Sequence, residues 1–528
     1  MTPKISPSRG GALLLGGALA VLATAVAPGV AAAAPGNDAA PGYNRSQGRD
    51  ASPGHRGNPR WRYDTTASTT VAEAASAVGA DRLWADGVTG RNVGVALVDT
   101  GVVPVDGLRG TNVVNGPDLS VESQSDALRH LDTYGHGTHL AGIIAGNDSR
   151  TGFRGIAPDA TLTSVKVGAA NGASDVSQVI AAIDWVVEHR NDDPRRPIRV
   201  LNLSYGTDGV QSYQIDPLTH AVENAWRAGI VVVVAAGNGG TDRPALNNPA
   251  TDPYVIAVGA ADTAGTANTA DDTVADFSSA GTASRRVDLV APGRSIVSLR
   301  DPGSYADTES PDARVGDRLF KGSGTSQSAA VVSGAAALLL QQRPELTPDQ
   351  VKALLVGTAR QLPKAGPAAG AGELNLGQAA RAKRPAAVQT WPASTGVGSL
   401  EAARGSWHLS AGDAVLTGEN DLFGPFNTAA WAKASSAGTA WVGGTWMGRR
   451  LTGSGWSAAS ASYPAWSGYT WSGYTWSGYT WSGDSWAGYT WSGYTWSGYT
   501  WSGYTWSGYT WSGYTWSGDV WAADVWGD

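Results

Sequence analysis

Residues 93–101 read Val-Gly-Val-Ala-Leu-Val-Asp-Thr-Gly, an apolar run of small and β-branched residues that ends in an acidic side chain. Such a run is typical of a strand that is buried on both faces of a sheet. Runs of the same character lie at 198–203, 230–235 and 254–258. A helix predicted to begin near Ser174 has one apolar face, which is made by Val176, Val179, Ile180, Ile183 and Val187. Strands that alternate with helices predict an α/β fold, doubly wound, with a mostly parallel sheet and helices on both faces.

Three polar side chains stand at the ends of predicted elements. Asp99 ends the first strand, His136 opens a helix of small residues, and Ser326 opens an apolar helix that runs to about Gln342. Parallel sheets bind and react at the carboxyl ends of their strands. A serine hydroxyl attacks a carbonyl only when a base removes its proton, and a buried carboxylate can orient that base. The pattern predicts Ser326 as nucleophile, His136 as general base and acid, and Asp99 as the group that orients His136.

A fourth segment supplies a donor for the charge that develops on the attacked oxygen. Residues 234–239 read Val-Ala-Ala-Gly-Asn-Gly, so Asn238 follows a buried strand at a glycine turn. Its side-chain NH2 is predicted to stabilise an oxyanion, together with the backbone N–H groups at the start of the Ser326 helix.

These segments resemble the subtilisin-like serine protease family, the subtilases, over about residues 80–360. The chain order Asp, His, Ser is that family's order. The matching motifs are Asp-Thr-Gly at 99–101, His-Gly-Thr-His at 136–139, Ala-Gly-Asn at 236–238, Ala-Pro-Gly at 291–293 and Gly-Thr-Ser at 324–326. The resemblance implies a serine-type endopeptidase that hydrolyses protein or peptide substrates through an acyl-enzyme intermediate. It also implies six substrate-binding residues: Ser204, Tyr205 and Gly206 along the substrate backbone, and Ala235, Ala236 and Gly237 in a wall of the primary specificity pocket.

Two positions depart from the family pattern. The family usually has Met directly after the serine and Pro four positions after it, where this chain has Gln327 and Ala330. Neither change removes a catalytic atom, so we expect activity to persist. His139 is predicted to be structural, and its spacing from His136 is not convincing for a metal pair. We expect no cofactor in the chemistry and assign no metal ligands; the resemblance leaves room for a structural calcium ion at sites that no loop spacing reveals.

The start of the chain predicts secretion. Basic residues, an apolar run over 11–27 and small residues up to Ala34 match a signal peptide over 1–34, with a membrane anchor as the alternative. A flexible lead-in (35–65) and the catalytic domain (66–385) follow. No later stretch is apolar enough to span a bilayer, so the secreted protein is predicted not to be membrane-spanning after signal cleavage. The space before the first catalytic strand also predicts that no full inhibitory propeptide exists.

Composition narrows the function further. The chain has 528 residues, a formal net charge of −7 and no cysteine. The absence of cysteine excludes a thiol nucleophile and disulfides. The acidic balance, without a Lys/Arg run, predicts no nucleic-acid partner.

The C-terminal part has a different composition. A Gly/Ala/Trp-rich connecting region (386–465) contains Trp at 431, 441, 446 and 456, and a Trp-Ser-Gly-Tyr-Thr repeat fills 466–528. A period of five places the Trp side chains on no single face of a helix or of a continuous strand. Three interpretations stay open: a low-complexity stalk, contact with a cell wall or polysaccharide through exposed aromatic rings, and self-association.

Two other functions compete with an active protease. In one alternative the protease domain is an inactive relic, and the chain is a binding protein that acts through its aromatic tail. The presence of all three triad residues together with Asn238 favours an active protease. The Asp-Thr-Gly motif would fit an aspartic protease, but that chemistry needs two such carboxylates and the chain has one such motif.

Overall fold

The computed structural model describes most of the chain between its two terminal regions. The described residues are 68–108, 112–362, 366–411 and 414–451. The predicted signal peptide (1–34), the predicted lead-in (35–65) and the pentapeptide repeats (466–528) lie outside them. The described residues therefore do not test the prediction that no full propeptide exists.

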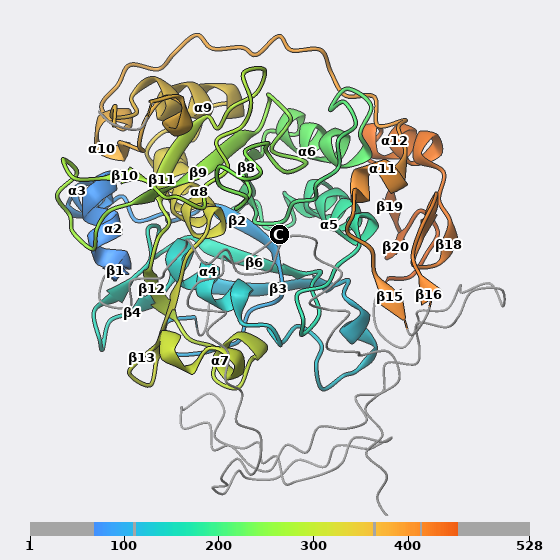
Figure 1. The fold of residues 1–528 in the computed structure, drawn as a ribbon, viewed down its shortest axis with the longest axis horizontal. Helices are drawn as coiled ribbons and strands as arrows, with labels where there is room; N and C mark the ends of the chain where they lie inside the picture. Colours follow the sequence, from blue (N-terminus) through green and yellow to red (C-terminus); the bar gives the residue numbers. More distant parts are fainter. Residues whose placement is uncertain (1–67, 109–111, 363–365, 412–413, 452–528) are drawn as a thin grey trace, which may run out of the picture. The chain divides into compact units, whose positions relative to one another are not determined.

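A mostly parallel sheet forms the centre of the structure (Figure 1). Among the described residues it has eight strands, in the order β10-β9-β8-β7-β2-β6-β3, with β11 also pairing with β9. Every neighbouring pair is parallel except β10 with β9. The strands are β2 (Gly94–Asp99), β3 (Val113–Asp118), β6 (Thr161–Lys166), β7 (Ile198–Leu203), β8 (Val231–Ala235), β9 (Ile256–Asp262), β10 (Thr273–Val274) and β11 (Leu289–Pro292).

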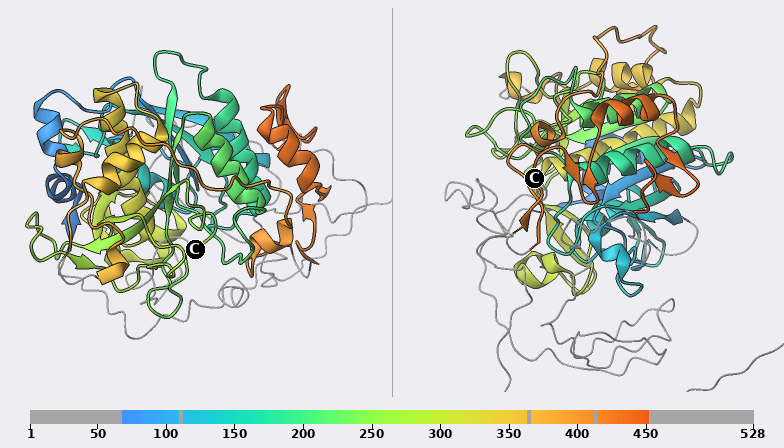
Figure 2. Two further views of the ribbon diagram at one scale, coloured as in Figure 1. Left: turned by 90° about the horizontal axis from the view of Figure 1, so that it is seen from above. Right: turned by 90° about the vertical axis from the view of Figure 1, so that its right-hand side faces the viewer.

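Helices cover both faces of this sheet (Figure 2). On one face α4 (His136–Ala145) packs against α8 (Thr325–Gln342), and on the other α5 (Val176–His189) packs against α6 (Pro217–Arg227). Both α4 and α5 contact β2, whose six residues are all buried. The predicted parallel sheet with covering helices is therefore confirmed.

Several predicted elements match closely. Strand β7 has the predicted bounds. Helix α9 (Pro348–Gly357), which the sequence analysis did not single out, begins after Thr347 with the reciprocal Thr347 and Gln350 hydrogen bonds of a capping box. Strand β9 starts two residues later than predicted, because the carboxylate of Asp252 accepts a hydrogen bond from the N–H of Tyr254 and turns the chain there. Strand β6 was not predicted, since Thr-Leu-Thr-Ser-Val-Lys has no continuous apolar run although all six residues are buried.

Smaller elements surround the main sheet. A second sheet has the order β1-β12-β14-β13. Its strands are β1 (Thr69–Thr70), β12 (Ile296–Leu299), β13 (Arg314–Val315) and β14 (Leu319–Gly322), and β4 (Asn147–Asp148) pairs with β5 (Phe153–Arg154). Among the described residues before 380, the other helices are α2 (Val71–Val78), α3 (Ala80–Ala85), α7 (Tyr305–Glu309) and α10 (Leu376–Ala379), with 3₁₀ turns at Val121–Gln124, Pro311–Ala313 and Gly366–Ala369.

The packed structure continues past residue 385, where the catalytic domain was predicted to end. After α10 an extended segment crosses the molecule and leads to α11 (Leu400–Arg404) and α12 (Thr428–Ser436), which pack on α5 and α6 (Figures 1 and 2). Three short hairpins complete this layer: β15 with β16 (Ser410–Ala411, Ala414–Val415), β17 with β18 (Asn420–Asp421, Gly424–Pro425), and β19 with β20 (Trp441–Val442, Thr445–Trp446). Of the predicted connecting region, residues 386–451 thus belong to the folded body, apart from the two undescribed positions.

Three tryptophans anchor the C-terminal layer on α5. Trp431 and Trp446 are almost fully buried and donate their indole N–H groups to the Asp184 carboxylate, at 2.7 and 2.8 Å. Trp441 donates to the carbonyl of Ala181 at 2.8 Å. These side chains form a core, so the connecting region is folded as far as residue 451, and the interpretations of the repeats at 466–528 stay open.

The β19–β20 hairpin also shows how two Trp residues five positions apart can share a face. Trp441 lies directly opposite Trp446 across a turn in which Gly443 and Gly444 both have positive φ. The expectation that a period of five separates neighbouring Trp residues concerns a continuous strand, and it does not apply to this pair, because the chain reverses between them.

None of the described helices is long and apolar enough to cross a lipid bilayer.

Candidate active site

The last residue of β2 and the first residue of α4 are in direct contact. Nδ1 of His136 lies 2.7 Å from Oδ1 of Asp99, and the two residues are 4% and 7% exposed. The backbone N–H of Thr100 donates to the same Asp99 oxygen at 2.8 Å. This carboxylate can therefore fix the ring orientation of His136 and stabilise a positive charge on it.

Glycine at position 137 allows this contact to form. A Cβ atom there would lie 2.1 Å from the carbonyl oxygen of Gly101, which is shorter than any real contact. Any larger residue would push the start of α4 away from the Asp-Thr-Gly turn. The Gly in His-Gly-Thr-His is thus a requirement of packing between the two catalytic segments.

Asp132, which the sequence analysis did not single out, holds the same two segments together. Its Oδ1 accepts hydrogen bonds from the hydroxyl of Thr100 and the N–H of Gly135, and its Oδ2 accepts from the N–H of Thr138, each at 2.7 Å. Burial raises the pKa of the Asp132 carboxyl, and these hydrogen bonds oppose that rise. In the sequence, the one feature that connects Asp132 with the catalytic residues is its position four residues before His136.

Ser326 is the second residue of α8 and is fully buried. Its carbonyl oxygen accepts a hydrogen bond from the hydroxyl of Ser204, which follows β7, at 3.4 Å. The preceding residue, Thr325, donates its N–H to Oδ1 of Asn238, which follows β8, at 2.9 Å. Because β8, β7 and β2 are neighbours, Ser326 and Asn238 lie at the same carboxyl edge as Asp99.

The contact with Thr325 sets the orientation of the Asn238 amide. A backbone N–H can only donate, so the Asn238 atom that faces it must be the oxygen. The hydroxyl of Thr325 also donates to that oxygen, at 3.0 Å. The NH2 end is then the part of the side chain that can serve as a donor to a substrate oxyanion.

The residues predicted to bind substrate flank this edge. Tyr205 is half-buried, and burial, followed by the nearby charge of Asp175, raises its pKa. Gly206 packs so tightly that a Cβ would lie 2.7 Å from the Cβ of Asn247. The N–H of Gly237 donates to the Thr325 hydroxyl at 3.2 Å. Of the remaining predicted pocket residues, Ala235 is 7% exposed and Ala236 is fully buried.

His139 has a structural environment. Its Nε2 lies 3.2 Å from the carbonyl oxygens of Ile296 and Phe320, on the second sheet. Burial, helped by the charge of His136, lowers the pKa of His139 to about 3, so its ring is neutral at ordinary pH. Within the described ranges, no three His, Asp or Glu side chains are arranged to hold a metal ion. The two departures, Gln327 and Ala330, are buried on α8.

Comparison with known proteins accounts for this arrangement. A model of the subtilase family matches residues 90–391, which is more than half of the chain. The chain belongs to the subtilase family. This is a family of serine-type endopeptidases, and relatives of the chain include the serine protease AprX of Bacillus subtilis (strain 168), 43% identical over 275 residues. That match covers 51% of this chain and 61% of AprX, so the chain spans less than two thirds of that relative.

Other subtilases match over more of their own length. Subtilisin DY of Bacillus licheniformis is 33% identical over 296 residues, which cover 56% of this chain and 93% of that protein. The crystal structure of a cold-adapted subtilisin-like serine proteinase is 31% identical, with a TM-score of 0.42, and the match covers 54% of this chain and 88% of that one.

Proposed function

We propose that this protein is a serine endopeptidase in which Ser326 attacks the peptide carbonyl, His136 moves the proton and Asp99 orients His136. His136 takes the proton of the Ser326 hydroxyl and returns it to the leaving amine. The resulting acyl-enzyme is then hydrolysed by water. Asn238 and the N-terminal N–H groups of α8 stabilise the oxyanion. No cofactor takes part in these steps.

The observation that carries this proposal is the 2.7 Å contact between His136 and Asp99, at the sheet edge to which Asn238 ties the Ser326 helix. Labelling the full-length protein with a fluorophosphonate tests it. We expect rapid labelling that Ser326→Ala abolishes, together with peptide hydrolysis that disappears in the same variant. Labelling that persists in Ser326→Ala would move the nucleophile elsewhere, and a protein that neither labels nor hydrolyses peptides would favour the relic interpretation.

The substrates in this proposal are proteins or peptides, with the substrate backbone along Ser204, Tyr205 and Gly206. A pocket wall of Ala235, Ala236 and Gly237 carries no charge, which favours an apolar side chain before the cleaved bond. A cleavage profile on a peptide library tests this, and a preference for Lys, Arg, Asp or Glu at that position would contradict it.

Secretion is the second part of the proposal. The basic start and the apolar run over 11–27 support export with cleavage near Ala34. Expression with and without residues 1–34, followed by fractionation and N-terminal sequencing of the product, tests this. Retention of the full-length protein inside the cell would contradict it.

Attachment to a cell wall or polysaccharide through residues 452–528 is the third part. The repeated Trp and Tyr rings support it, because aromatic rings stack on the flat faces of sugars. Sedimentation of the active protein with insoluble peptidoglycan or cellulose, compared with a version that ends after Leu451, tests it. Equal sedimentation of the two versions would remove this role from the tail.

A further inference from the structure

The loop that follows β7 is fastened to helix α11 of the C-terminal layer. The hydroxyl of Thr207 donates to the carbonyl of Ala403, and the Asp208 carboxylate accepts from the N–H of Ser406 at 2.7 Å and from its hydroxyl. A Cβ at Gly209 would lie 2.7 Å from the carbonyl oxygen of Ala402, so backbone approaches backbone. These contacts begin one residue after the proposed substrate segment Ser204–Gly206.

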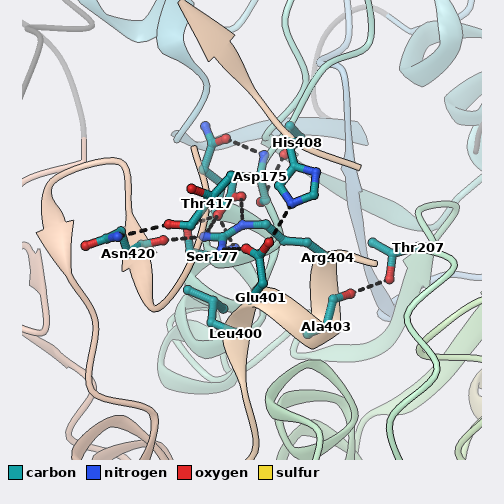
Figure 3. Close-up of polar contacts among 12 residues, drawn as sticks. Asp175, Ser177, Thr207, Leu400, Glu401, Ala403, Arg404, His408, Thr417 and Asn420 are labelled. Atoms are coloured by element: carbon teal, nitrogen blue, oxygen red, sulfur yellow. Dashed lines mark hydrogen bonds and ion pairs between the residues drawn. The ribbon is translucent and has the colours of Figure 1, made fainter. Parts of the chain in front are cut away.

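Arg404, the last residue of α11, connects this helix to the start of α5. Its Nε lies 2.6 Å from Oδ1 of Asp175, and both side chains are 0% exposed (Figure 3). Asp175 also caps α5 by accepting from the N–H of Ser177 at 2.9 Å. The other guanidinium N–H groups donate to the Glu401 carboxylate and to the carbonyls of Gly418 and Asn420. A fully buried and fully paired guanidinium of this kind holds its partners in one arrangement.

The ion pair lies close to the substrate segment itself. The charges of Asp175 and Arg404 act on the pKa of Tyr205 in opposite directions, after the larger effect of burial. Tyr205 is the middle residue of Ser204–Gly206. Strand β2, which ends in Asp99, lies between β6 and β7. The loop after β6 leads to Asp175, and the loop after β7 leads to Thr207. Helix α11 and the residues next to it thus contact the segments on both sides of the catalytic strand. We call the contacts with Asp175, Thr207 and Asp208 the α11 brace.

We propose that Arg404 is a positioning residue for extended peptide substrates: through α11 it fixes the segment Ser204–Gly206 against which the substrate backbone lies. This deepens the proposed function and rests on it. The C-terminal layer, on this proposal, is part of the substrate-binding apparatus, although it contributes no group to the bond-breaking step. Loosening the brace should weaken the binding of peptides that reach along Ser204–Gly206. It should leave the reactivity of Ser326 unchanged.

Two variants of the full-length protein test the proposal. Asp175→Asn with Arg404→Met removes both buried charges together, because removal of one alone would leave the other uncompensated; Asn is also a good helix cap. Thr207→Val keeps the side-chain volume and removes the hydroxyl that donates to the carbonyl of Ala403 and accepts from the N–H of Gly209. It decides the question if the double variant does not fold. The matched control is Thr219→Val. Thr219 is also buried, and its hydroxyl contacts the carbonyl of Tyr213 and the hydroxyl of Ser394, neither of which belongs to α11.

The measurements separate peptide binding from chemistry. They are kcat and KM for a tetrapeptide p-nitroanilide, kcat/KM for a single-residue ester, and the inactivation rate by diisopropyl fluorophosphate. For Thr207→Val we expect KM of the tetrapeptide to rise about two- to tenfold, the equivalent of one net hydrogen bond. The ester and the fluorophosphate should change by less than about twofold, since they do not use the brace. The double variant should show the same split with a larger rise, and Thr219→Val should match the wild type.

Three outcomes would overturn the proposal. One is a parallel loss with all three reagents, which would indicate a general structural role. The second is an unchanged KM in both brace variants, and the third is an equal rise in the control. Failure of the proposed function would look different, since the wild type itself would then react with neither peptide nor fluorophosphate.

Discussion

Oδ1 of Asn238 accepts hydrogen bonds from the N–H and the hydroxyl of Thr325, at 2.9 and 3.0 Å. One amide group therefore ties the end of β8 to the start of α8, next to Ser326. In the proposed mechanism the same amide donates to the oxyanion, so Asn238 has a structural and a catalytic role that a well-chosen substitution can separate.

Asn238→Asp makes that separation. It keeps an oxygen for Thr325 but removes the NH2 donor, so kcat should fall by at least about 10²–10³, a magnitude that comes from subtilisin itself. Steady-state kinetics on a peptide substrate measure this, and thermal unfolding reports on the link to Thr325. We expect a thermal midpoint closer to the wild type than that of Asn238→Ala, which loses both roles. Retention of more than about a tenth of the wild-type kcat would contradict the oxyanion role.

Asp132→Asn should weaken the alignment of the catalytic pair. One of the two oxygens of Asp132 becomes an NH2 group, which faces an N–H donor and leaves it without an acceptor. We expect a loss of about 1–3 kcal/mol in the free energy of unfolding, with a lower kcat and a nearly unchanged KM. Asp126→Asn is the matched control, because the Asp126 side chain is 83% exposed and only pairs with Arg129. A stable variant with wild-type kcat would show that Asp132 does not position His136.

Asp184 should make the stability of the protein depend on pH. Burial raises the pKa of Asp184 in the folded protein from 3.8 to about 6, against the hydrogen bonds from Ser435, Trp446 and Trp431. The folded protein therefore keeps a proton that the unfolded chain loses between about pH 4 and 6. The contribution of Asp184 to stability is complete below pH 4 and is lost as the pH rises through 6, a change of about 3 kcal/mol.

Asp184→Asn should remove this dependence while it preserves the packing. The Asn oxygen can accept from both indoles, and its NH2 can donate to the Ser435 hydroxyl. Urea unfolding at pH 4 to 7 should show the variant gaining stability over the wild type as the pH rises. Asp192→Asn, at an exposed position just after α5, should not. A constant difference between variant and wild type across this range would contradict the assignment.

Gln327 should make the enzyme resistant to peroxide. The chain contains two methionines and no cysteine, and neither methionine stands next to Ser326. Activity should therefore persist after peroxide treatment, whereas Gln327→Met should lose activity as a sulfoxide forms beside the nucleophile. Active-site titration before and after treatment measures this. Met447→Leu is the control for damage elsewhere, and rapid inactivation of the wild type that Met447→Leu does not prevent would contradict the prediction.

The elements that carry the catalytic residues were predictable because their signals are local. A buried strand that ends in Asp99 and a helix that starts at His136 each show in a short stretch of sequence. Strand β7 could be read residue by residue for the same reason. Strand β6 could not, because its Thr, Ser and Lys residues are buried by neighbours that lie far away in the sequence.

The C-terminal layer marks the limit of local inference. Residues 386–451 contain many Gly and Ala, and their Trp residues resemble the repeats that follow, so composition suggested a connecting region. In the structure Trp431 and Trp446 share the carboxylate of Asp184, more than 240 positions earlier in the chain. No pattern within either segment reveals such a pairing.

By itself, the sequence of this protein determined the alternation of strands and helices, the family resemblance, and the residues proposed for catalysis, because each depends on periodicity or on a short motif. Only the tertiary structure decided that Asp132 joins the two catalytic segments and that Arg404 reaches Asp175. Both are buried carboxylate contacts whose partners come from different elements, and such contacts depend on three-dimensional proximity, which no local spacing encodes.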